Sequence, residues 1–376
     1  MRSLQHPHWL RPRVTVFGRR VSSFQVCGSA GLLLATLLVS VLAWHEGLSA
    51  LVVACLLATG LATALALAMA TKILTGREAL VYYHHEIAIL SMSAIVLHAL
   101  GAPVLRYLDL NALWLGAFLV CGRQGCLMVG CCHGRPHHWG VRYGDAHARE
   151  GFPECYVGVR LFPIQALESM IVAAIVAVGT FTVWSGRQPG SALCFYVVSY
   201  CAVRIWLEEL RGDEARPYWG RFSEAQWTST VLMVLILVGE WQGRLPRSDW
   251  HLGVGLVTAL GMVILALSGR ARHRILAPRH ASEVASLIHS LAQSQVGPIA
   301  VRRTSQAFGV STQSLGCLSG RPAALYSLSH GRRGLDAGEA RVLSRLIVNL
   351  IGARGAQALL QGSRGIYHLI VREAPR

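Results

Sequence analysis

Long apolar runs, separated by short polar connections, occupy most of the chain up to residue 269. A membrane-spanning helix needs roughly 20 consecutive, mostly apolar residues, and most of these runs reach that length. We therefore predict an all-α polytopic membrane domain over residues 26–269, with about seven or eight transmembrane helices. The expected spans are 26–44, 50–71, 79–104, 109–121, 162–184, 190–209, 224–240 and 251–269.

The fourth apolar run is short, and the connection that follows it is long. Residues 109–121 are too few for a full crossing, so we expect a partial or re-entrant helix there. Residues 122–160 are polar and rich in His, Arg and Gly. Long loops between tightly connected elements often carry function, which makes this stretch a candidate site.

A basic segment, residues 1–25, precedes the first apolar run. Five arginines lie among the first twenty residues, and a cleaved signal peptide can begin in the same way. The run from Val26 to Trp44 is nevertheless long enough to span a membrane. We therefore predict an uncleaved first helix.

The pattern changes to that of a small α+β module over residues 270–376. Apolar positions at helical spacing predict a helix in 281–295. Asp336, with Glu339 three residues later, predicts the start of a second helix, which Gly352 would end. The runs 298–303 and 365–371 are β-like. The apolar positions of the first predicted helix are Val284, Leu287, Ile288 and Leu291.

Composition supports this division. Hydrophobic residues make up 53% of the 376 and charged residues 14%, against roughly 25% charged in soluble domains. About +11 of the net charge of +16 lies in 270–376, with 15 arginines against four acidic residues. Basic flanks at both ends favour two cytoplasmic termini, although the arginines of the 211–221 loop make the asymmetry incomplete. We find no motif that reads nucleic acid, and no nucleic-acid partner is expected.

Several charged residues fall in or beside the apolar runs, where they are costly and often functional. Tyr200, Arg204, Glu208 and Arg211 are spaced to share one helical face, which must face the bundle interior or a watery cavity. Arg123 lies in a glycine-rich stretch, and guanidinium groups match phosphate oxygens. We interpret these groups as a phospholipid headgroup site, with His84, or alternatively His85, as acid or base. The alternative is a set of structural ion pairs among Glu168, Arg204, Glu208 and Arg211.

Cysteine and histidine are concentrated in the same polar stretch. They include enough soft ligands for zinc, but their spacing fits no standard ligand pair. We therefore expect these cysteines to line a pocket or to pack, rather than to bind metal or form a redox pair. The residues are Cys121, Cys126, Cys131, Cys132, His133, His137, His138 and Cys155.

Over about residues 80–240 the ordered motifs resemble the prolipoprotein diacylglyceryl transferase family. The family signature Gly-Arg-x-Gly-Asn…Gly-Glu-x-x-Gly-Arg appears as Gly122-Arg123-Gln124-Gly125-Cys126 and Gly130-Cys131-Cys132-His133-Gly134-Arg135. The family's other motifs are matched by Pro163 to Glu168, Tyr200 to Arg211, Gln226 and His84. Cys126 and Cys131 replace the Asn and Glu of the signature, so the chain resembles a divergent member.

The resemblance implies a multi-pass transferase of the bacterial inner membrane. It would move the diacylglyceryl group of phosphatidylglycerol to the lipobox cysteine thiol of a preprolipoprotein, in lipoprotein biosynthesis. Its catalytic residues would be Arg123 and Arg204 for the phosphate, His84 for the thiol proton and Tyr200 for positioning. No metal or other cofactor is expected, because arginines can supply the positive charge. The substrate-binding residues would be Gly125, Cys126, Gly130, Cys131, Gly134, Arg135, Gln165, Glu168 and Glu208.

Two other functions fit the same residues. The first is a relative that moves another lipid-derived group or modifies another acceptor, with Cys126 or Cys131 as a new participant. The second is a catalytically silent membrane scaffold or lipid-binding protein, whose basic module binds a partner or an acidic surface. Loss of activity on removing Arg123 and Arg204 would favour the transferase.

Overall fold

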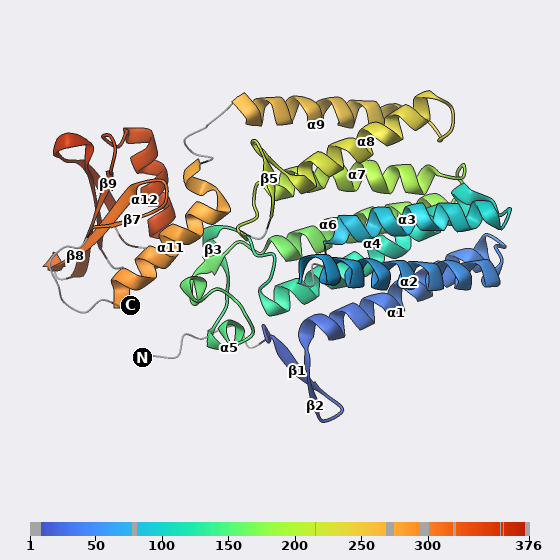
Figure 1. The fold of residues 1–376 in the computed structure, drawn as a ribbon, viewed down its shortest axis with the longest axis horizontal. Helices are drawn as coiled ribbons and strands as arrows, with labels where there is room; N and C mark the ends of the chain where they lie inside the picture. The colour runs from blue at the N-terminus through green and yellow to red at the C-terminus, as the bar shows by residue number, and fades with distance from the viewer. Residues whose placement is uncertain are drawn as a thin grey trace.

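The computed structural model describes residues 9–76, 81–214, 216–267, 274–293, 301–318, 321–353, 355 and 357–372. Within these residues, eight long helices form one bundle, and a smaller module lies beyond one end of it (Figure 1). This architecture confirms the predicted fold class. The bundle helices are α1 (Ser23–His45), α2 (Ala50–Thr75), α3 (Tyr82–Ala99), α4 (Val104–Val129), α6 (Ile164–Trp184), α7 (Ser191–Glu208), α8 (Glu224–Trp241) and α9 (Asp249–Leu267).

Six of these helices are long and apolar enough to cross a membrane, judged over the described residues. The other two, α3 and α8, carry polar groups in their first turns, such as His84 and Gln226. Helix α3 packs against α2 and α4, and α8 packs against α7 and α9. All eight expected segments are therefore helices of one bundle, and six of them are candidate membrane spans among the described residues.

Helix α4 lies at the centre of the bundle, in contact with α1, α3, α6 and α7. Leu113 on α4 is fully buried. The neighbouring helices come close because Gly116 has no side chain: a Cβ there would lie 2.6 Å from both Tyr196 and Val176. A larger residue at this position would force α6 and α7 away from α4.

The expectation of a partial helix over 109–121 is wrong. Helix α4 continues to Val129, and Gly130 ends it in the left-handed conformation with φ 86°. The apolar pattern stops early because Arg123 and its polar neighbours lie inside the helix, where the protein and not lipid surrounds them. The polar connection therefore starts at residue 130, and the first half of the glycine-rich signature is helical.

Two other expected boundaries also shift. Helix α7 ends at Glu208, so Arg211 lies beyond the helix and does not extend its polar face. Helix α3 ends at Ala99, short of the expected 104. The expected start of that span, at 79–80, lies outside the described residues.

The connection between α4 and α6 folds against the end of the bundle. It contains β3 (Pro136–Arg142), the short helix α5 (Asp145–Ala148), the 3-10 helix η1 (Glu154–Tyr156) and β4 (Arg160–Leu161). Strands β3 and β4 pair antiparallel. Two further hairpins lie at the same end (Figure 1). They are β1 (Arg13–Val16) with β2 (Arg19–Ser22), and β5 (Tyr218–Trp219) with β6 (Phe222–Ser223).

The C-terminal module consists of two helices packed on an antiparallel sheet with the order β10-β11-β9-β8-β7. Both predicted helices are confirmed, and Asp336 caps the second by accepting from the Glu339 backbone N–H. Of the run 298–303, the part 298–300 lies outside the described residues. The elements are α11 (Pro278–Gln293), β7 (Arg302–Arg303), β8 (Phe308–Leu318), β9 (Arg321–His330), α12 (Ala337–Ile351), β10 (Gln357–Gln361), η2 (Ser363–Gly365) and β11 (Tyr367–Arg372).

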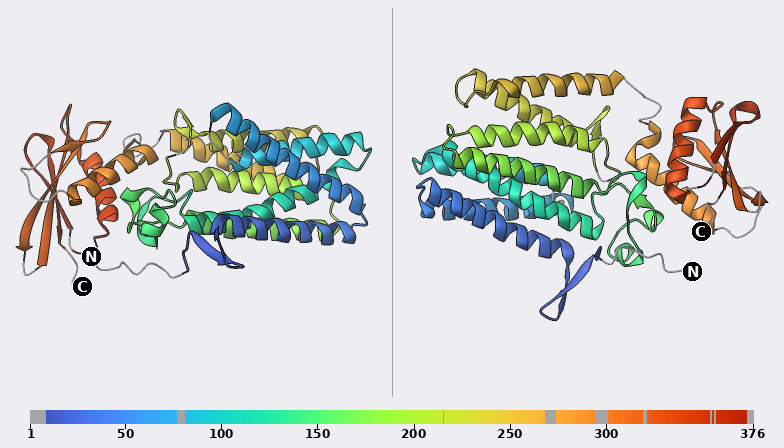
Figure 2. Two further views of the ribbon diagram at one scale, coloured as in Figure 1. Left: turned by 60° about the horizontal axis from the view of Figure 1, so that its bottom comes forward. Right: turned by 180° about the vertical axis from the view of Figure 1, so that it is seen from behind.

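The module packs directly on the α4–α6 connection, as all views in Figures 1 and 2 show. Leu127, Tyr143 and Tyr156 of the membrane domain share one apolar core with Val284 and Leu346 of the module. The Asn349 amide also donates to the Pro136 carbonyl at 3.2 Å. Since eight helices run back and forth, the first hairpin, the connection and the module all lie at one end of the bundle.

Candidate functional site

Three bundle helices converge on the carboxylate of Glu168, a residue of α6 that is 1% exposed. Arg123 on α4 places Nε 2.9 Å from one carboxylate oxygen. On α7, Tyr200 donates its hydroxyl to the other oxygen at 3.0 Å, and Arg204 lies 3.7 Å from it. Three of the four predicted catalytic residues are therefore brought together around one buried carboxylate.

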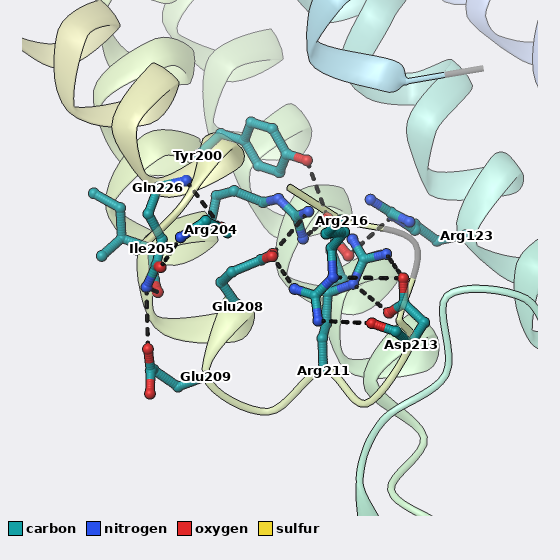
Figure 3. A network of polar contacts seen from close by, with 12 residues as sticks. Arg123, Tyr200, Arg204, Ile205, Glu208, Glu209, Arg211, Asp213, Arg216 and Gln226 are labelled. Carbon is teal, nitrogen blue, oxygen red and sulfur yellow. Dashed lines mark hydrogen bonds and ion pairs between the residues drawn. The ribbon is translucent and has the colours of Figure 1, made fainter. Parts of the chain in front are cut away.

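The polar contacts continue into the loop after α7 (Figure 3). Glu208 pairs with Arg204 at 2.9 Å and also contacts Arg216. Arg211 donates two hydrogen bonds to Asp213, at 3.0 and 2.9 Å. We call the whole set the arginine cluster. It comprises Arg123, Arg204, Arg211, Arg216, Glu168, Glu208 and Asp213.

The arginine cluster has four guanidinium groups against three carboxylates, so it carries an excess positive charge. Burial lowers the pKa of Arg216 to about 10, which still leaves it charged at neutral pH. Arg204 Nη1 is buried and makes no hydrogen bond in the described part of the chain. Unbalanced charge and unused donors are costly in a low-dielectric setting. An anion placed beside Arg204 would offset both.

A cavity of about 120 Å³ between α3, α7 and α8 reaches the arginine cluster at Arg204 and is also lined by Tyr200. Glu86 on α3 contributes a buried carboxylate to its wall. Most of the remaining lining is apolar. The cavity therefore has a charged end and an apolar side, which suits an amphipathic ligand. The apolar lining includes Ile87, Leu90, Val197 and Leu232.

His84 lies apart from this group. Its Nε2 is 2.9 Å from Glu224 of α8, and 43% of its side chain is exposed. It is absent from the cavity lining. His85, the alternative, has its Nδ1 against the carbonyl of Val81 at 2.9 Å. The role of His84 in proton transfer stays a prediction.

The three predicted substrate-binding glycines face protein atoms. A Cβ at Gly125 would lie 3.1 Å from Phe24 and Cys27 of α1. One at Gly130 would lie 2.8 Å from Phe152. One at Gly134 would lie 2.3 Å from the carbonyl oxygen of Phe162. Close packing of helices and loops therefore explains why glycine occupies all three positions.

Gln165 and Arg135 join the signature to the neighbouring segments. Gln165 is 1% exposed and donates to the carbonyl of Cys131 at 2.8 Å. Arg135 Nε donates to the carbonyl of Arg211 at 3.2 Å, and Gly134 pairs with Arg211 in an isolated bridge. These contacts hold the start of the α4–α6 connection against the loop after α7.

Cys126, Cys131 and Cys132 bring their sulfur atoms within 4.8 Å of one another. Hydrogen bonds from Cys126 and Cys131, with the nearby charges of Arg211 and Arg123, lower the pKa of Cys132 well below its usual value. Linear spacing did not predict this arrangement. Cys132 adopts a left-handed conformation with φ 53°, and that turn brings neighbouring cysteines to one point.

Sequence reasoning assigned no role in the site to Asp213, Arg216, Glu86 and Tyr83. The loop after α7 alternates arginines with acidic residues, a signal of internal pairing that we used only for membrane orientation. Tyr83 and Glu86 line the cavity, but their sequence gives no sign of which face of α3 they occupy relative to α7. These positions needed the packed structure.

Comparison with known proteins places this site in a family context. A family model described as prolipoprotein diacylglyceryl transferase matches residues 20–241. The phosphatidylglycerol–prolipoprotein diacylglyceryl transferase 2 of Clostridium perfringens is 30% identical over 119 residues, covering 30% of this chain and 42% of that protein. The phosphatidylglycerol–prolipoprotein diacylglyceryl transferase of Clostridium tetani is 26% identical over 149 residues, covering 38% and 55%. The chain thus spans about half the length of these curated relatives.

Proposed function

Because the chain belongs to the prolipoprotein diacylglyceryl transferase family, we propose that it transfers the diacylglyceryl group of phosphatidylglycerol to a preprolipoprotein. The acceptor is the lipobox cysteine thiol, and the product is a thioether. Both substrates meet the enzyme in the bacterial inner membrane. The relatives from Clostridium carry the names of this donor and this acceptor.

The observation that carries the proposal is the arginine cluster beside an amphipathic cavity. A phosphodiester headgroup at Arg204 would offset the excess positive charge and use the donor Nη1, which lies 3.7 Å from Glu168 Oε1. The glycerol and the start of an acyl chain would lie along the apolar side of the cavity of about 120 Å³, and the rest of the chains would extend into the surrounding lipid. Guanidinium groups bind phosphate oxygens with two parallel hydrogen bonds, so this site favours a phospholipid.

The reaction forms one C–S bond and breaks one C–O bond. The acceptor sulfur attacks the glyceryl carbon, and glycerol 1-phosphate leaves with the electron pair of the broken bond. Arg123 and Arg204 stabilise the negative charge that develops on the leaving phosphate. Glu168 holds both guanidinium groups in place, and Tyr200 fixes the orientation of Glu168.

His84 accepts the proton of the acceptor thiol. Its contact with Glu224 at 2.9 Å orients the imidazole ring. Because His84 is partly exposed, a peptide can reach it from the aqueous end of the bundle.

A complementation experiment tests the function. Arg123→Ala and Arg204→Ala should each lower lipoprotein modification by roughly 10²-fold or more in cells depleted of their own transferase. Arg187→Ala, in the exposed loop at the opposite end of the bundle, is the matched control and should leave modification unchanged. Mass spectrometry of a reporter lipoprotein measures the product, and gel filtration verifies folding. An unmodified reporter with the wild-type chain would favour a silent lipid-binding protein.

A further inference from the structure

The three clustered thiols form a donor set that the arginine-based chemistry leaves unused. Cys126 lies on the last turn of α4, and Gly130 ends that helix with a left-handed φ of 86°. The chain turns again at Cys132, with φ 53°. These two turns bring a helical cysteine and two consecutive loop cysteines together, with all three sulfur atoms within 4.8 Å of one another.

This spacing suits one thiophilic metal ion. Zn–S bonds are about 2.3 Å long, which places the sulfurs of a tetrahedral site roughly 3.8 Å apart. Movement of about 1 Å would bring the three thiols to that distance. Sites with three protein ligands keep a fourth position open, which is the arrangement of catalytic rather than structural zinc.

Backbone contacts hold the cysteine segment beside the arginine cluster. The Gly212 N–H, next to Arg211, donates to the carbonyl of His133 at 2.9 Å, directly after Cys132. Gln165 donates to the backbone of Cys131 at 2.8 Å and fixes this segment to α6.

Cys131 is exposed, whereas Cys126 is buried and Cys132 is partly buried, so a ligand can reach the thiols at Cys131. Cys126 lies on the last turn of α4, and Arg204 lies near the end of α7. A ligand at the fourth position would therefore lie at the same end of the bundle as the arginine cluster.

We propose that Cys126, Cys131 and Cys132 bind one zinc ion, whose fourth position takes the acceptor thiol as a thiolate. Zinc binding is argued from the positions of the three thiols alone, whereas binding of the acceptor thiol to the zinc rests on the proposed function. On binding, the acceptor thiol releases its proton to His84 or water. The zinc-bound sulfur then forms the C–S bond as the C–O bond of the donor breaks, and the neutral thioether, a weaker ligand, dissociates.

Measuring the metal content tests zinc binding by the three cysteines without any activity assay. Full-length protein, purified in detergent under reducing conditions, should contain about one zinc per chain by elemental mass spectrometry. Cobalt(II) should replace it and give a thiolate-to-metal charge-transfer band. Cys126→Ser, Cys131→Ser and Cys132→Ser should each lose most of the metal, whereas Cys55→Ser on α2 should keep it. Absent metal, metal retained in all three variants, or a disulfide among these cysteines would each overturn the proposal.

A peptide titration tests whether the acceptor thiol binds at the fourth position of the metal. A lipobox peptide with its cysteine should shift the cobalt band, and the same peptide with serine should not. An unchanged band with both peptides would overturn the acceptor role. Metal binding without transfer would contradict the proposed function and leave the site standing. Transfer by a metal-free protein would contradict the acceptor role of the metal and leave the function standing.

Discussion

Glu168 is the residue on which the buried charges of the arginine cluster depend. Its two oxygens contact Arg123, Arg204 and Tyr200, and its side chain is 2% exposed. Removing a buried counter-ion leaves the partner charge uncompensated, which is far more costly than losing an exposed pair. Glu168 therefore stabilises the fold as well as the proposed chemistry.

We expect Glu168→Gln to destabilise the protein by about 3–5 kcal/mol, because two buried guanidinium groups lose their shared carboxylate. Thermal unfolding in detergent measures the change. Asp249→Asn removes a carboxylate that is 94% exposed, and it should alter stability by less than about 0.5 kcal/mol. Equal, small effects of the two substitutions would show that the pairing at Glu168 contributes little.

Single residues differ in how well the sequence predicted them. Arg123 and Arg204 could be predicted to face inward, because a charge in a long apolar run must avoid lipid. Arg216 and Asp213 could not, since their pairing depends on how the loop folds back below α7. The thiol cluster depends on the left-handed turn at Cys132, a conformation rare for residues other than glycine.

Helix ends position the site, and Gly130 is the clearest example. It ends α4 in the left-handed conformation, directly before the clustered cysteines. Gly76 ends α2 in the same conformation, with φ 69°. A Cβ at Gly130 would meet Phe152 at 2.8 Å, whereas one at Gly76 would meet no atom of the described residues within 4 Å. Comparing the same substitution at the two positions therefore separates the cost of backbone strain from the cost of crowding against Phe152.

Gly76→Ala should cost about 1–2 kcal/mol, from the left-handed backbone alone. Gly130→Ala should cost about 1–3 kcal/mol more, because the methyl group also crowds Phe152. Thermal unfolding of both variants checks the difference. If the two destabilise the protein equally, Phe152 moves aside freely and the end of α4 is not tightly packed.

The cap of α12 introduces a pH dependence. Because the backbone N–H of Glu339 donates to Asp336, the pKa of Asp336 lies below its usual value of 3.8. The folded module therefore takes up this proton less readily than the unfolded chain does. The stabilisation by the cap is fully present above pH 3.8 and is lost as the pH falls through the lowered pKa.

Asp336→Ala should destabilise α12 by about 1 kcal/mol at neutral pH. Its difference from the wild type should shrink as the pH falls below 3.8. Hydrogen exchange of residues 337–351 in the full chain measures both effects. Asp336→Asn keeps a good capping group that does not titrate, so its exchange should stay close to that of the wild type at neutral pH. A pH-independent difference for Asp336→Ala would contradict this role of the carboxylate.

Helices and strands could be predicted where the residues that define them lie within one short stretch of sequence. The capping residues and apolar face of α12 are complete in the sequence, and this helix was predicted at its observed start and end. Strands β8 and β9 were missed because most of their residues are small or polar, and few beyond Phe308, Val310 and Leu328 are deeply buried. Their hairpin is defined by pairing between strands, which no short stretch reveals.

At the scale of the whole molecule, the arrangement of helices places all the chemistry at one end. Helix α9 returns the chain to the end that holds the arginine cluster, and the module then packs on the α4–α6 connection (Figure 2). The sequence predicted a basic module but not its contact with the site. That contact depends on apolar residues, such as Tyr156 and Val284, that are far apart in the chain.

We therefore expect the module and the α4–α6 connection to lie on the same side of the membrane. Cys317 is a natural exposed thiol in the module, and Ala146→Cys would add one on the exposed surface of α5. A membrane-impermeant maleimide should label both from one side only. Intact cells and inverted vesicles present opposite sides, and peptide mapping identifies the labelled cysteine.

Ser185→Cys, in the exposed turn after α6, is the matched control and should be labelled only from the opposite side. Labelling of Cys317 and Ala146→Cys from different sides would mean that one of α6 to α9 does not cross the membrane. The polar start of α8 makes that helix the first to examine. In that case the module could not pack on the connection, and the apolar surface around Tyr156 would need another cover.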